Sequence, residues 1–82
     1  MKILYFYTEW CDACSPVHNI LIDIMKKYNN IELKEIDAEQ NPDTINKYNI
    51  NAYPTVIFID NDKIIKTICG YKEKELYYEL FN

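Results

Sequence analysis

The chain has 82 residues, of which 49% are apolar and only one is glycine, so it is long enough for one ordered domain, residues 1–82. Its formal net charge is -4, with lysines and acidic residues interspersed, which argues against nucleic-acid binding because no basic surface can form. No run approaches the roughly 20 apolar residues of a membrane span. Met1 and Lys2 lead directly into a strand-like segment, so we expect neither a signal peptide nor a membrane anchor.

The cysteine content indicates the compartment. There are three cysteines, an odd number, and two of them lie three positions apart. A small secreted scaffold usually carries an even, dispersed set that forms structural disulfides. The sequence therefore predicts an intracellular, cytoplasmic protein, expected to be a monomer, whose stability depends on its core.

The first half of the chain predicts a strand, a helix and a second strand. Residues 3–7 form an apolar and aromatic run typical of a central strand buried on both faces. Apolar residues then recur at helical spacing and predict a helix that begins near the cysteines and ends near Asn29, with Pro16 in its first turn: Val17, Ile20, Leu21, Ile24, Met25 and Tyr28. Residues 31–36 alternate partly and predict a second strand, parallel to the first because a helix connects them.

The second half predicts a short helix, a hairpin and a closing helix. Asn41 and Pro42 fit the N-cap and first position of a helix. Residues 55–59 and 63–68 predict two antiparallel strands joined by the polar turn 60–62, and the apolar residues between 76 and 81 predict the last helix. The result is an α/β fold of order β-α-β-α-β-β-α, with a four-stranded mixed sheet covered by helices on both faces.

We expect the reactive site at the junction between the first strand and the first helix. Cys11 falls at this junction, at the carboxyl edge of the sheet, where the helix N-terminus favours the Cys11 thiolate. Cys14 is close enough in sequence to close a small disulfide ring with Cys11. In the predicted cycle Cys11 attacks a target disulfide, and Cys14 then displaces the reduced target.

Several motifs resemble those of thioredoxins in the same order and at similar spacing: residues 9–14 (Glu-Trp-Cys-Asp-Ala-Cys), 36–37, 40–42, 47–48, 53–55 and Gly70. The resemblance covers nearly the whole chain and implies a minimal thioredoxin fold with strand order 2-1-3-4. It implies that Cys11 is the nucleophile and Cys14 the resolving thiol. It further implies a substrate groove bordered by Trp10, Tyr53, a cis Pro54 and Gly70.

The same resemblance implies the partners. Disulfide-containing proteins would be the substrates, and a flavin-dependent thioredoxin reductase would return electrons to the pair. The protein itself would need no cofactor and no metal.

The chain also departs from thioredoxins. It lacks their first strand and helix, and Asp12 and Ala13 replace the usual Gly-Pro between the cysteines, so that a carboxylate opposes the Cys11 thiolate. Tyr5 stands where the family has a buried, proton-accepting Asp, and Leu33 stands where it has a partner Lys. Glu9 and Glu35 are the candidates to replace that missing base.

Two other functions remain open. The chain length also suits a glutathione-dependent, glutaredoxin-like enzyme, although Tyr53 replaces the usual Val and no Gly-Gly and Asp arrangement follows. Alternatively, Cys11, Cys14 and His18 are three ligands of a metal-binding module, although no second CxxC completes four ligands. We interpret His18 otherwise as a solvated helix residue.

The third cysteine, Cys69, has two interpretations. As a small apolar residue near the end of the last strand, it is expected to be structural. Because it precedes Gly70, the alternative hypothesis is that it is exposed near Cys11 and forms mixed disulfides, including with glutathione.

Overall fold

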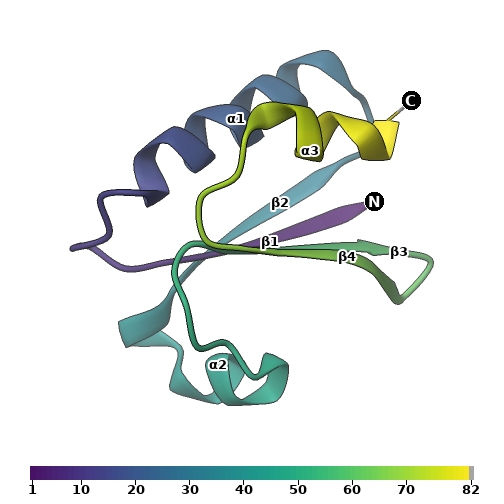
Figure 1. Ribbon diagram of the computed structural model, residues 1–82. Coiled ribbons are helices and arrows are strands. Elements are labelled where there is room, and N and C mark those ends of the chain that lie inside the picture. The colour runs from purple at the N-terminus through teal and green to yellow at the C-terminus, as the bar shows by residue number, and fades with distance from the viewer. Residues whose placement is uncertain (82) are drawn as a thin grey trace.

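The computed structural model describes residues 1–81, and its elements follow the predicted order (Figure 1). The elements are β1 (Lys2–Tyr7), α1 (Cys14–Lys27), β2 (Glu32–Asp37), η1 (Ala38–Gln40), α2 (Pro42–Tyr48), β3 (Thr55–Asp60), β4 (Lys63–Cys69), α3 (Lys74–Tyr78) and η2 (Glu79–Phe81). The two short 3-10 segments, η1 and η2, were not predicted. Each predicted strand agrees with the observed one to within one residue at either end.

The sheet has the strand order β2-β1-β3-β4, which confirms the expected order. β1 pairs in parallel with β2, because α1 carries the chain back across the sheet between them. β3 is antiparallel to both β1 and β4. The β3–β4 hairpin turns through Asn61 and Asp62, whose positive φ angles of 52° and 63° are those that a tight hairpin turn requires.

Helices cover both faces of the sheet, as predicted: α1 and α3 lie on one face and α2 on the other (Figure 1). The larger core cluster lies beneath α1 and α3 and is formed by Ile3, Tyr5, Cys14, Val17, Leu21, Ile24, Val56, Phe58, Ile68 and Tyr77. A smaller cluster of Leu4, Phe6 and Ile57 lies on the α2 side. β1 contributes to both clusters, because alternate side chains of a strand point to opposite faces.

The helices of residues 1–81 include none that is both long and apolar enough to cross a membrane.

Two buried hydroxyls within residues 1–81, those of Thr8 and Tyr77, lack a hydrogen-bond partner, and Tyr77 belongs to the larger core cluster. The Tyr77 side chain is fully buried, yet its hydroxyl has no hydrogen-bond partner among residues 1–81. Its ring packs edge-on against Phe58, with the centroids 6.1 Å apart. Tyr5 is also buried, but its hydroxyl donates to the carbonyl oxygen of Cys14 at 3.0 Å. The two tyrosines therefore form a matched pair, one with and one without a partner for its hydroxyl.

We expect Tyr77→Phe to leave the free energy of unfolding unchanged or raise it by up to about 1 kcal/mol, because it removes an unpartnered buried hydroxyl. Tyr5→Phe should lower it by about 1 kcal/mol, because it removes a buried hydrogen bond. Urea unfolding of both variants measures the difference. Equal losses in the two variants would contradict the assignment of these hydroxyls.

Candidate active site

The loop that joins β1 to α1 carries Cys11, and two tight turns hold it. The backbone N–H of Cys11 donates to the carbonyl of Thr8 at 3.3 Å, and that of Cys14 donates to the carbonyl of Cys11 at 3.2 Å. α1 begins only at Cys14, with Ala13 as its N-cap. The expectation that Cys11 itself stands at the helix N-terminus is therefore wrong, because the two turns occupy the residues before Cys14.

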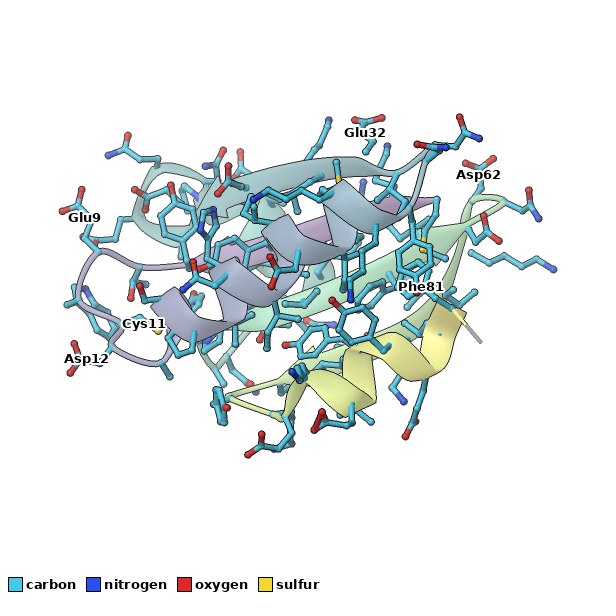
Figure 2. All side chains as sticks on the ribbon, turned by 90° about the horizontal axis from the view of Figure 1, so that it is seen from above. Glu9, Cys11, Asp12, Glu32, Asp62 and Phe81 are labelled. Atoms are coloured by element: carbon cyan, nitrogen blue, oxygen red, sulfur yellow. A yellow bond between two sulfur atoms is a disulfide. The ribbon has the colours of Figure 1, made fainter. Side chains whose placement is uncertain are left out.

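Cys11 and Cys14 form a disulfide, with their Cα atoms 5.4 Å apart. This separation lies within the usual range for disulfide-bonded residues. The two cysteines differ in exposure: Cys14 is 5% exposed and belongs to the core, whereas Cys11 is only partly buried. Figure 2 shows Cys11 with Glu9 and Asp12 at one end of the molecule, and Asp62 at the opposite end. A partner can therefore approach Cys11 more easily than Cys14.

Pro54 and Gly70 meet at the start of the β3–β4 pair. The Tyr53–Pro54 peptide bond is cis, as the resemblance implied. The N–H of Gly70 donates to the carbonyl of Pro54 at 2.7 Å, and Gly70 has a φ of 74°, which an L-residue rarely adopts.

Cys69 precedes Gly70 and pairs with Thr55 in the ladder. The expectation that Cys69 is a buried structural residue is wrong, because its side chain is exposed on the outermost strand. The hypothesis that it forms mixed disulfides stays a prediction.

Trp10 and Tyr53 form an aromatic pair beside the loop. Their ring centroids are 6.5 Å apart with an interplanar angle of 85°, an edge-to-face contact. Trp10 is 70% exposed, whereas Tyr53 is partly buried and packs against both core clusters. This contact places Trp10, which precedes Cys11, next to Tyr53, which precedes Pro54.

Tyr5 lies beneath the first turn of α1. Its hydroxyl donates to the carbonyl oxygen of Cys14, and its ring stacks on Tyr7 with the centroids 5.3 Å apart. Burial, together with the negative charge of Glu35 and the neighbouring Tyr7, raises the pKa of Tyr5 to about 12. Tyr5 is therefore protonated near neutral pH and serves as a hydrogen-bond donor.

His18 is a partly exposed helix residue, as expected, but it also contacts another element. Its Nε2 lies 2.7 Å from Oε1 of Glu35 on β2, and its ring centroid lies 5.7 Å from that of Tyr5. Sequence reasoning missed this contact, because it depends on the strand register, in which Glu35 pairs with Tyr5. In residues 1–81, no group of three or more His, Cys, Asp or Glu side chains is placed to hold a metal ion.

Comparison with known proteins identifies the family. The sequence model of the family described as thioredoxin matches residues 1–80. The chain belongs to the thioredoxin family.

The similar proteins span most of the chain. It is 27% identical over 78 residues to a thioredoxin of Bacillus subtilis, covering 94% of this chain and 75% of that protein. It is 33% identical over 69 residues to a thioredoxin of Streptomyces clavuligerus, covering 84% and 64%. Among solved structures, thioredoxin-2 of a malaria parasite has the same fold, with a TM-score of 0.88, 23% identity, and coverage of 98% of this chain and 79% of that one.

Family membership and the cysteine pair together define the activity class. The thioredoxin-family chain is a thiol–disulfide oxidoreductase of the disulfide-reductase type, with a redox-active Cys11–Cys14 disulfide. The family suggests disulfide-containing proteins as substrates and a reductase as partner.

The two buried tyrosines give a test at alkaline pH. Burial raises the pKa of both Tyr5 and Tyr77 from 10.0 to about 12. Between these two values the phenols of the unfolded chain have lost protons that those of the folded chain still hold. The contribution of these tyrosines to the free energy of unfolding is therefore fully present below pH 10.0 and is lost as the pH rises toward about 12. We expect the double variant Tyr5→Phe, Tyr77→Phe to show a shallower decline than the unmodified protein in urea unfolding across this range. Parallel declines would contradict the raised pKa values.

Proposed function

We propose that Cys11 is the nucleophile and Cys14 the resolving thiol of a small disulfide reductase. The observation that carries this proposal is the unequal burial of a disulfide-bonded pair: Cys11 is partly buried on a loop, and Cys14 is in the core. An incoming disulfide must be reached by the exposed thiol. The buried thiol needs to reach only its neighbour.

The cycle transfers two electrons to the substrate. The Cys11 thiolate attacks one sulfur of the target disulfide, which forms a mixed disulfide and releases the first target thiol. Cys14 then attacks Cys11, which releases the second target thiol and leaves the Cys11–Cys14 disulfide. The substrate is reduced to two thiols, and the protein is oxidised.

Trp10, Tyr53, Pro54 and Gly70 form the proposed substrate groove. The Trp10–Tyr53 contact and the Gly70–Pro54 hydrogen bond bring these four residues together in two adjoining pairs. The 70% exposed Trp10 supplies an apolar surface next to Cys11. An extended segment of a protein substrate fits such an open surface better than a small molecule does, because small ligands favour enclosed pockets.

We further propose that the chain acts as a single domain, residues 1–82, and as a cytoplasmic monomer. A flavoprotein thioredoxin reductase would reduce its disulfide after each turnover. The family match over residues 1–80 supports this partner class, since the reductase must recognise the same face that the substrates use.

Cys14→Ser tests the roles of the two cysteines. In a Cys69→Ser background, we expect Cys14→Ser to accumulate a stable mixed disulfide between Cys11 and a protein substrate such as insulin, because the resolving thiol is missing. Cys11→Ser should form no such adduct. Non-reducing electrophoresis and mass spectrometry measure the adducts. Accumulation on the Cys11→Ser variant instead would reverse the assigned roles.

A coupled assay tests the reductant. We expect oxidation of NADPH by insulin to proceed with this protein and a flavoprotein thioredoxin reductase, and to be at least roughly tenfold slower with glutathione and glutathione reductase. The expected difference follows from the open groove, which has no identified glutathione site among its four residues. Faster turnover with glutathione would favour the glutaredoxin-like alternative.

A further inference from the structure

The resolving step poses a problem of proton transfer. On the proposed roles, Cys14 attacks Cys11, and a thiol must lose its proton before it can attack, because the thiolate is the nucleophile. Cys14 is only 5% exposed and lies in the core cluster beneath α1. Burial in apolar surroundings disfavours the thiolate. A nearby group that accepts the proton would therefore speed this step.

Tyr5, the residue beneath Cys14, does not provide that group. Its hydroxyl already donates to the carbonyl oxygen of Cys14, at 3.0 Å. With its pKa raised to about 12, the phenol keeps its proton at neutral pH. Tyr5 therefore fixes the backbone of Cys14, and the base must come from elsewhere.

His18 lies one helical turn after Cys14, on the same face of α1. Residues four apart on a helix have Cβ atoms about 5–6 Å from each other. Helical side chains also lean toward the N-terminus, so the imidazole leans toward the turn that carries Cys14. The Tyr5 ring lies 5.7 Å from the His18 ring, while its hydroxyl contacts Cys14, so one buried residue touches both.

Glu35 determines which nitrogen of His18 is available. Its Oε1 lies 2.7 Å from Nε2, so the neutral ring donates its Nε2–H to the carboxylate. Nδ1, the nitrogen closer to the helix backbone, then carries the free lone pair. A carboxylate that orients an imidazole in this way also stabilises the imidazolium that forms when the ring takes up a proton.

We propose that His18, held in place by Glu35, accepts the proton of the Cys14 thiol when Cys14 resolves the mixed disulfide. The proton passes to Nδ1 directly or through one water. The Cys14 sulfur forms a bond to the Cys11 sulfur as the bond from Cys11 to the target sulfur breaks. The departing target thiolate takes up a proton, which His18 can return, so protons and electrons balance.

The charged and titratable groups around His18 come from three elements. β2 supplies Glu35, and β1 supplies Tyr5 and Tyr7. α1 supplies Cys14, whose carbonyl accepts the hydrogen bond from Tyr5. Of these groups, the Glu35 carboxylate is in direct contact with the imidazole, at 2.7 Å.

The two thiol attacks can be measured separately with dithiobis(nitrobenzoate). In a reduced Cys69→Ser background, attack by Cys11 releases one coloured thiolate at a rate that depends on reagent concentration. Resolution by Cys14 releases the second at a rate that does not. Stopped-flow absorbance therefore reports the proposed function in its first phase and this inference in its second.

We expect His18→Gln to slow the second phase by roughly 10²-fold at neutral pH, the usual scale of general base catalysis, and to change the first less than about twofold. Glu35→Gln should slow the second phase by a smaller factor. Glu32→Gln, which removes an exposed carboxylate elsewhere on the same strand, is the matched control and should change neither phase. Glu35→Gln also keeps the test decisive if His18→Gln fails to fold.

The pH profile distinguishes a proton acceptor from a structural contact. In the unsubstituted chain the rate of the second phase should rise with pH through an inflection, because a general base accepts a proton only in its unprotonated form. In His18→Gln that inflection should be lost, and the rate should follow only the ionisation of the Cys14 thiol, which burial disfavours. An unchanged inflection, or a second phase altered less than twofold, overturns this inference while leaving the cysteine roles intact. Loss of the first phase, or of any second release by the unsubstituted chain, would instead overturn the proposed function.

Discussion

The hydrogen bond from the Tyr5 hydroxyl to the Cys14 carbonyl joins the central strand to the helix that carries the resolving cysteine. It is buried, so water cannot replace it without cost. Tyr5 comes from β1, the strand that contributes to both core clusters. The position of Cys14, and through the disulfide that of Cys11, therefore depends on a strand whose central residues are buried. Cys11 keeps its exposure because only the short loop before α1 carries it.

The strand order of the sheet also explains why segments that are distant in sequence lie close to the cysteines. β3 lies next to β1 and runs antiparallel to it, so the start of β3 lies at the edge where β1 ends. Pro54 precedes that start, and the hydrogen bond from Gly70 fixes the end of β4 beside it. Trp10 contacts Tyr53 across the same edge. The proposed groove is thus a consequence of strand order more than of any loop conformation.

The fold could be predicted from the sequence because each of its elements carries a local pattern. The apolar run 3–7 and the helical spacing from Val17 to Tyr28 identify the first two elements without reference to any contact. The start of α1 could not be placed, because Ala13 makes no side-chain cap and the turns before it leave no pattern in residue type. The exposure of Cys69 was also missed, since a residue at the end of an edge strand can face either core or solvent.

The sequence was sufficient to predict the reacting cysteines, but it was not sufficient to predict the contacts between the residues around them. A CxxC motif at a strand-to-helix junction specifies the reacting pair by spacing alone. The contact between His18 and Glu35 joins residues from a helix and a strand that are 17 positions apart, so only the tertiary structure brings them together. Local periodicity predicts which face a residue occupies, and it does not predict which side chain of another element meets it there.

Tyr5, the side chain that contacts Cys14 from the central strand, is neutral rather than acidic. Tyr5 is 3% exposed, so a carboxylate at its position would be buried, and burying a charge costs stability unless the group is paired or protonated. A phenol is neutral, packs well and still holds the Cys14 carbonyl. The carboxylate of Glu35 and the imidazole of His18 lie nearer the surface, with side chains 48% and 38% exposed, where water can solvate them. In this arrangement Tyr5 holds the backbone of Cys14, and the proposed proton acceptor is a different residue, His18.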